Sequence, residues 1–181
     1  MPDRLYFTDS DEANELIAKD PMALLIGFAL DQQVPVQKAF SGPLVLRERL
    51  GTLEPQALAA ADLEPIFAQK PAIHRFPAAM ARRVHALAQH ICDEYGGDAR
   101  RVWASTRSSE QLKRNLAALP GFGEMKVGSL AAVLEKQMKI KAAAGIGPDH
   151  PTLGDVDSLD ALADYQAAKR AHKARLKAKA G

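Results

Sequence analysis

The chain has 181 residues, of which 47% are hydrophobic and 25% are charged, and its net charge is +2. This composition is typical of a soluble globular protein with one core or two small lobes. The single cysteine, Cys92, excludes an intramolecular disulfide, a four-cysteine zinc site and a cysteine-held iron–sulfur cluster. The longest apolar run, residues 22–30, is too short to span a bilayer, and the acidic first residues do not resemble a signal peptide. We expect a cytoplasmic protein without a membrane partner.

Helical patterns separated by short breaks follow one another along the whole chain. We find no alternating strand pattern and no repeat, so the predicted fold is all-α. The predicted helices cover about 10–18, 21–30, a stretch ending near 50, 54–60, 63–69, 76–95, a stretch from 108 or 109 to 119, a stretch through 127–134, and a last helix from 157 or 158. Residues 141–154 are expected to form a loop.

Short sequence signals set the predicted ends of these helices. Asp9, three residues before Glu12, resembles a capping box, and Pro21 suits the first turn of the next helix. Gly51 and Gly96 are typical of residues that follow a helix. We expect residues 1–154 to form one helical domain, with two lobes around a cleft as one arrangement, and residues 155–181 to form a basic C-terminal helix or tail.

Charge is distributed unevenly along the sequence. Residues 70–141 carry 13 basic and 6 acidic side chains, and residues 165–181 carry 6 basic and no acidic ones. Such a pattern favours a polyanionic partner, although a basic face is often only solvated. We expect the tail to be a helix with charge on most of its faces that adds non-specific, salt-sensitive affinity for such a polyanion.

The stretch LPGFGEMK, residues 119–126, places a tight turn between two helical patterns. One interpretation is an ordinary αα-hairpin, whose turn often contains glycine. The other is an anion site: Gly121 and Gly123 let the backbone amides at a helix start approach a phosphate, while Phe122 points inward. The basic residues nearby are Lys113, Arg114 and Lys126. This combination suits a nucleic-acid backbone that is held without reading its sequence.

The same stretch resembles the hairpin of the helix-hairpin-helix (HhH-GPD) DNA glycosylases, the superfamily of endonuclease III and of the 3-methyladenine and 8-oxoguanine glycosylases. Two further segments resemble that family in the right order: LLIGFALDQQVPVQKA, from Leu24, and MARRVHALAQHICDEYGGDA, from Met80. The likeness covers roughly residues 20–140. It implies an all-α glycosylase-like fold, truncated on its C-terminal side, that binds duplex DNA with a damaged base; we expect a monomer, associated with the nucleoid.

The resemblance also assigns roles to particular positions. It implies DNA contacts by Gln33, which would fill the gap left by an extruded base, and by the hairpin with its neighbouring cations. The hairpin set is Gly121, Phe122, Gly123, Lys126 and Arg114. A monovalent cation bound by backbone carbonyls near Leu119 and Gly121 is a further implication. No histidine has the spacing of a metal ligand, and no other cofactor is expected.

The chain departs from the family pattern at two points. Bifunctional members carry a nucleophilic lysine where this chain has Met125; Lys126 comes one residue later, which turns its side chain by about 100°. Lys126 is therefore expected to contact phosphate, and the enzyme to lack lyase activity.

The second departure concerns the catalytic aspartate, which the family places some twenty residues after the hairpin. Here Asp149 and Asp155 are the candidates, a chain without such a residue is the alternative, and Asp157 is expected to cap the last helix. The sequence thus favours a monofunctional DNA glycosylase; the alternative is a non-catalytic helix-hairpin-helix DNA-binding module.

Overall fold

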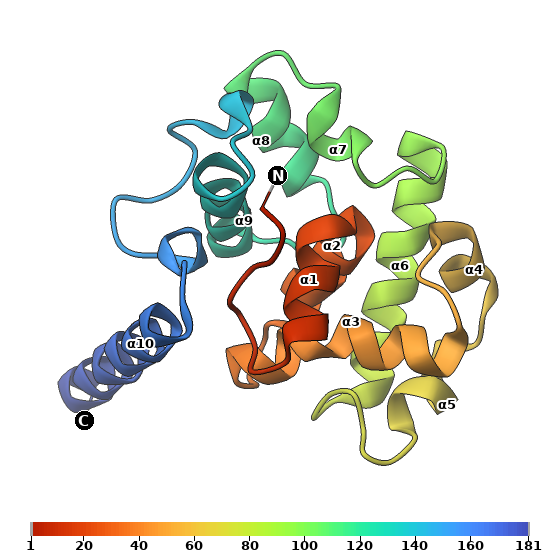
Figure 1. Ribbon diagram of the computed structural model, residues 1–181, viewed down its shortest axis with the longest axis horizontal. Helices are drawn as coiled ribbons and strands as arrows, with labels where there is room; N and C mark the ends of the chain where they lie inside the picture. Colours follow the sequence, from red (N-terminus) through yellow and green to blue (C-terminus); the bar gives the residue numbers. More distant parts are fainter. Residues whose placement is uncertain (1, 181) are drawn as a thin grey trace.

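The computed structural model describes residues 2–180, which form ten α-helices and two short 3₁₀ turns and contain no strand. The all-α prediction is therefore confirmed. Figure 1 shows the helices gathered into one body from which the last helix projects. In chain order they are α1 (Asp11–Lys19), α2 (Pro21–Leu30), α3 (Val36–Leu50), α4 (Pro55–Ala60), α5 (Leu63–Ala68), α6 (Pro77–Tyr95), α7 (Arg101–Ala104), α8 (Ser109–Ala117), α9 (Glu124–Lys136) and α10 (Leu159–Ala180), with 3₁₀ turns η1 (Lys141–Ala143) and η2 (Leu153–Asp155).

Most predicted helix ends agree with the structure to within a residue or two. Gly51 and Gly96 follow α3 and α6 in the left-handed conformation, with φ of 93° and 62°. The cap of α1 was wrongly assigned, because Ser10 rather than Asp9 caps the helix and accepts a hydrogen bond from the Ala13 amide. The cap of α10 was wrongly given to Asp157, since the Ser158 hydroxyl accepts the Ala161 amide instead. The one-turn helix α7 was not predicted.

Helix α2 is the centre of the core. Its residues from Met22 to Leu30 are all buried, and it packs against α1, α3 and α6. The α2–α3 contact is close because α2 carries a glycine where the helices cross: a Cβ on Gly27 would lie 2.4 Å from the Phe40 ring. An apolar helix enclosed on all sides is expected from a sequence that lacks a polar face.

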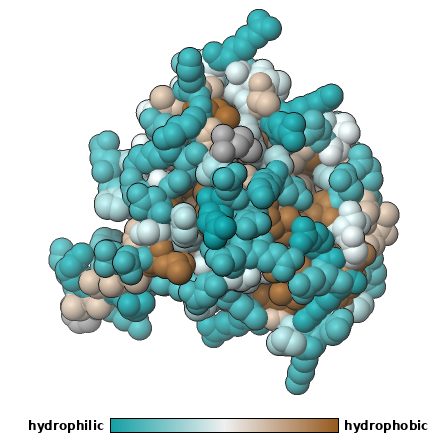
Figure 2. Space-filling model, viewed as in Figure 1, coloured by the Kyte–Doolittle hydropathy of each residue, from teal (hydrophilic) through white to brown (hydrophobic). Residues whose placement is uncertain are grey.

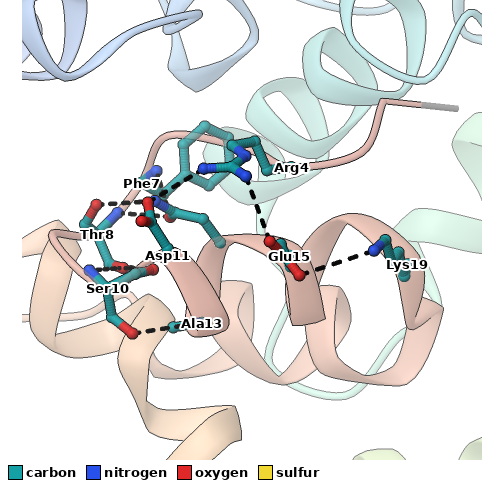
Figure 3. Close-up of polar contacts among 9 residues, drawn as sticks. Arg4, Phe7, Thr8, Ser10, Asp11, Ala13, Glu15 and Lys19 are labelled. Atoms are coloured by element: carbon teal, nitrogen blue, oxygen red, sulfur yellow. Dashed lines mark hydrogen bonds and ion pairs between the residues drawn. The ribbon is translucent and has the colours of Figure 1, made fainter.

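The segment before α1 is fixed to that helix by a buried asparagine. The Asn14 side chain accepts the amides of Phe7 and Thr8 at 3.1 and 3.0 Å and donates to the Thr8 carbonyl at 3.0 Å. Figure 3 also shows Arg4 reaching two carboxylates of α1. Exposed ion pairs contribute little to stability, so the buried amide hydrogen bonds and the burial of Phe7 hold this segment.

The helices pack in two groups that share one hydrophobic core. Helices α1–α6 pack mainly on one another, whereas α8 and α9 pack with each other and with α7, η1 and η2. The groups meet where α2 ends and α9 begins, because the Lys126 ammonium donates to the Ala29 carbonyl there at 3.1 Å. Hydrophilic side chains cover most of the face seen in Figure 2. Within residues 2–180, no helix has the length and apolar character needed to cross a membrane.

Candidate nucleic-acid interface

The turn between α8 and α9 has the conformation that its glycines predicted. Gly121 is left-handed, with φ of 81°, and the Phe122 amide donates to the Leu119 carbonyl at 3.1 Å. Leu119 and Phe122 are buried, with 2% and 6% of their surface exposed. Phe122 therefore anchors the hairpin in the core, which confirms the prediction that its side chain points inward; a DNA contact at this position would involve its backbone. The Leu119 carbonyl has a second lone pair, which suits the cation implied by the resemblance.

The start of α9 presents free backbone donors. Gly123 occupies the cap position without a capping side chain, and the first backbone bond of the helix joins the Val127 amide to the Gly123 carbonyl. In the described chain, the amides of residues 124–126 donate no hydrogen bond. A Cβ on Gly123 would meet nothing within 4 Å, and Glu124 and Met125 are exposed, so this end of α9 faces solvent. Glu124 is the one acidic residue in this first turn.

The loop between α2 and α3, residues 31–35, lies beside the hairpin. Arg83 of α6 joins the two: its guanidinium donates to the Gln32 side-chain oxygen, and its Nε lies 2.9 Å from the position that a Cβ on Gly121 would occupy. Gln33, the next residue, is exposed and has a positive φ of 58°. Such a conformation is uncommon for a residue with a side chain. The structure thus brings the predicted wedge residue and the predicted hairpin into one neighbourhood.

A buried histidine holds the backbone of residues 30–32, where the loop between α2 and α3 begins. His74 is 1% exposed, and its Nε2 lies 3.0 Å from the Leu30 carbonyl and 3.1 Å from the Gln32 carbonyl. Its Nδ1 accepts the Phe76 amide at 3.0 Å, so the ring proton resides on Nε2 and is shared by the two carbonyls. Burial lowers the pKa of His74; its hydrogen bonds to the Leu30 and Gln32 carbonyls partly offset this effect, and the Lys38 and Arg83 charges add to it. The neutral imidazole is the form that makes all three contacts.

Met125 and Lys126, at the start of α9, differ in exposure. Met125 is 87% exposed, whereas Lys126 is half-buried, donates to the Ala29 carbonyl and lies over the Phe122 ring at 5.8 Å. Burial, with a further contribution from the Arg83 charge, lowers the pKa of Lys126 to about 8, and Asp31 partly offsets this. Lys126 therefore supplies charge at the edge of the hairpin from a fixed position. Arg114 is exposed on α8.

Asp31 is the carboxyl group closest in sequence to the Gln32–Gln33 loop, and it is partly buried. Burial raises its pKa, while the charges of Lys169 and Lys126 partly counteract that rise. Sequence reasoning singled out neither Asp31 nor His74. The only signal for Asp31 was its place at the end of an apolar run, and His74 carried none, because its three partners belong to segments far apart in the chain or to loop backbone.

The two predicted catalytic aspartates follow α9 in the chain and lie beside different parts of that helix. Asp155 is at the far end: it pairs with Lys136 at 2.6 Å and accepts the Thr152 amide at 2.8 Å, and Lys136 is twelve residues, about 18 Å, from the start of α9. Burial would raise the pKa of Asp155, but its hydrogen bonds with Lys136 and Thr152 outweigh that effect and lower it. These contacts give Asp155 a capping role.

Asp149 lies nearer to the hairpin and is exposed. The preceding residue, Pro148, approaches Gly128, where its Cδ is 3.3 Å from the position of an added Cβ. Gly128 is four residues, or about one turn, into α9. Of the two candidates, Asp149 is therefore the one that the loop carries back towards the hairpin. Asp157 is exposed as well.

Two hollows of about 440 and 410 Å³ lie elsewhere on the body, and neither includes a hairpin residue. The first is lined by α5, by the residues just before it and by α6, and the second by residues at the starts of α2 and α4 and around Asp98. No group of three or more His, Cys, Asp or Glu side chains within residues 2–180 is arranged to hold a metal ion.

Comparison of the chain with models of known families, with curated proteins and with solved structures finds no match. The geometry of the hairpin and the Gln33 loop, together with the resemblance of three sequence segments, is what indicates a function.

Proposed function

We propose that the chain is a base-excision repair protein that binds duplex DNA and hydrolyses the N-glycosidic bond of a damaged base without lyase activity. The observation that carries the proposal is the position of Arg83, which contacts the Gln32 side chain and lies against Gly121 of the hairpin. Three segments that resemble glycosylase segments in sequence are thereby neighbours in space. Segments that resembled the family only by chance would not be expected to lie together in the folded chain.

The hairpin would hold the DNA backbone next to the damaged nucleotide. The uncapped amides of residues 124–126 and the partial positive charge of the α9 N-terminus favour a phosphate oxygen. Arg114 is exposed on the preceding helix, and its charge adds to the attraction. Contacts of this kind fix the position of a duplex without selecting its sequence.

Gln33 is suited to support the base stack after a nucleotide has been extruded. Its side chain is exposed, while its backbone is held in a left-handed conformation next to two His74 hydrogen bonds. Extrusion leaves a gap whose unstacked neighbours cost energy unless a protein group replaces the missing base. A rigid loop loses little conformational entropy when its side chain enters that gap.

The chemistry would be hydrolysis assisted by a carboxylate. The C1′–N bond breaks, the base leaves with the electron pair and gains a proton, and water adds to C1′ while losing a proton. Asp149 is the candidate that would stabilise positive charge on the sugar and accept the proton from water. Lyase chemistry needs an accessible amine nucleophile, whereas the Lys126 amine is held by the Ala29 carbonyl and Met125 has none.

The second candidate function is a DNA-binding module without chemistry. It is favoured by the engagement of Asp155 in a cap and an ion pair, and by the position of both hollows away from the hairpin. Under this alternative the hairpin and Gln33 have the same roles, and Asp149 is an ordinary loop residue.

The test is single-turnover excision on duplexes that each contain one lesion: uracil, hypoxanthine, 3-methyladenine or 8-oxoguanine. Wild type is compared with Asp149→Asn and, as a matched control, with the exposed Asp157→Asn. Abasic product that breaks only after alkali, and that is lost in Asp149→Asn alone, supports the glycosylase. Duplex binding without excision of any lesion supports the module, and strand breaks without alkali contradict the absence of lyase activity.

A further inference from the structure

Helix α10 ends in an exposed segment that projects from the body (Figure 1). Every residue from 167 to 180 is exposed, and Figure 1 shows the helix leaving the body at its blue end. Six of these residues are basic and none is acidic; they are Lys169, Arg170, Lys173, Arg175, Lys177 and Lys179. We define residues 167–180 as the arm.

Among residues 2–180, no cation of the arm has a carboxylate partner within ion-pair distance. All seven ion pairs in the described part of the chain involve residues 4–155, and none involves the arm. Lys169, Lys173 and Lys177 follow one another at spacings of four, so like charges face each other along one side of the helix, which destabilises it. Alanine, lysine and arginine nevertheless favour helix strongly. A polyanion laid along the arm would remove the repulsion.

The composition of the arm distinguishes among possible partners. Its only large apolar side chain is Leu176, which is 54% exposed, and the remaining uncharged positions are alanines and His172. A helix that docks on a protein groove or lies in a membrane surface needs a continuous apolar stripe, which the arm lacks. Small alanines between cations let the helix approach a phosphate backbone closely.

The root of α10 is fixed beside the loop that carries Gln33. Leu162 is buried, and the Gln166 and Gln37 side chains donate to each other, one of these bonds being 2.9 Å long. Gln37 is in the first turn of α3, four residues after Gln33. Lys169, the first cation of the arm, and Lys126 of α9 both act on the Asp31 carboxyl group. The arm therefore begins where the hairpin helix and the Gln33 loop meet.

We propose that the arm of α10 is a second duplex-binding element, which follows the DNA backbone away from the site at Gln33 and the hairpin. From Lys169 to Lys179 the helix rises about 15 Å, which corresponds to about four base pairs at 3.4 Å each. The arm lengthens the DNA footprint and adds phosphate contacts; it takes no part in lesion recognition. This inference rests on the proposed function, because it uses the same duplex.

The test neutralises one side of the arm in the full-length protein. The arm variant carries Arg170→Gln, Lys173→Gln and Lys177→Gln, substitutions that keep good helix formers. The control variant removes the same charge from exposed positions on the body, with Arg100→Gln, Arg107→Gln and Lys141→Gln. Affinity for undamaged duplexes of increasing length is measured over a range of salt concentrations, and circular dichroism checks that helix content is unchanged.

The arm variant is expected to lower the slope of log affinity against log salt by about 2 to 3, since each phosphate contact contributes about 0.9. It should also lose the gain in affinity that wild type shows when the duplex is lengthened beyond the hairpin site. Equal effects of the two variants, or no effect of the arm variant, would overturn the inference. So would binding of the arm to vesicles of anionic lipid without any change in duplex affinity.

Two outcomes separate this inference from the proposed function. If wild type binds no duplex even at low salt, both fail. If wild type binds duplex, and Gly123→Ala weakens binding while the arm variant does not, only the inference about the arm fails.

Discussion

Alanine at the two hairpin glycines should separate folding from DNA binding. At Gly121, φ is 81°, and a left-handed backbone costs a residue with a Cβ about 1–2 kcal/mol. The added Cβ would also lie 2.9 Å from Arg83 Nε, a flexible side chain that can move but would then leave Gln32. Gly121→Ala should therefore lower the free energy of unfolding by about 1–2 kcal/mol, equivalent to a fall in Tm of about 2–8 °C for a chain of this length.

Gly123→Ala is the matched substitution with the opposite expectation. Its φ is −84°, and its Cβ meets nothing within 4 Å. Alanine is a poorer cap than glycine but restricts the unfolded chain, so these effects offset each other to within about 0.5 kcal/mol. The methyl group would instead stand in front of the open amides of α9. Duplex affinity should fall about tenfold, or about 1.4 kcal/mol.

Urea unfolding followed by circular dichroism, and fluorescence anisotropy with a labelled duplex, measure the two effects. The reasoning is refuted if Gly121→Ala unfolds at the same urea concentration as wild type, because the left-handed backbone would then carry no cost. It is equally refuted if Gly123→Ala folds normally and binds duplex as well as wild type, because the open amides would then not be the phosphate site.

Three further predictions follow from the titratable groups of the interface. The pKa of His74 is lowered in the folded protein. The neutral imidazole therefore stabilises the fold fully above about pH 6.5, and this stabilisation is lost as the pH falls through the pKa of the folded state. The difference in the free energy of unfolding between wild type and His74→Phe, measured by urea unfolding, should shrink from pH 7.5 to pH 5. Lys126 has a pKa of about 8, so the affinity of wild type for duplex at constant salt should decrease between pH 7 and pH 9.5 as this charge is lost. Lys126→Gln should remove that decrease. The same pH profile in wild type and Lys126→Gln would contradict this prediction. The pKa of Asp31 is raised in the folded protein, so ionisation of this carboxyl group opposes folding as the pH rises through its folded-state pKa. Asp31→Asn should therefore be at least as stable as wild type at pH 7, and the difference should diminish towards pH 4. A variant less stable than wild type at pH 7 would refute this prediction.

The elements that sequence patterns predicted well are those whose signals are local. The apolar stripe from Met80 to Ile91 and the glycine after it define α6, because one face of a helix and its C-terminal turn are both encoded within a few residues. Gly51, which follows α3 in the left-handed conformation, is a local signal of the same kind. Helix α7 has only four residues, which is too short for any periodicity, so it was missed.

The candidate site was only partly predictable, for the same reason. The hairpin and Gln33 are contiguous motifs, and they could be named before their positions in space were known. The Arg83 contacts and the His74 hydrogen bonds to Leu30 and Gln32 connect residues 38 to 51 positions apart in the chain, and no local pattern encodes them. The shifted pKa values of Asp31 and Lys126 arise from burial where α2, α9 and α10 meet. Asp155 illustrates the converse: the family resemblance made it a catalytic candidate, whereas its contacts are those of a cap.

The central claim is that the loop with Gln33 and the hairpin act on one duplex at a gap in its stack. The most direct measurement is the affinity of wild type and Gln33→Ala for two duplexes of equal length, one intact and one with a tetrahydrofuran abasic-site analogue. We predict that wild type prefers the abasic duplex, and that Gln33→Ala loses this preference but keeps the salt dependence of wild type. Equal affinity of wild type for both duplexes, or a preference that survives in Gln33→Ala, would contradict the account.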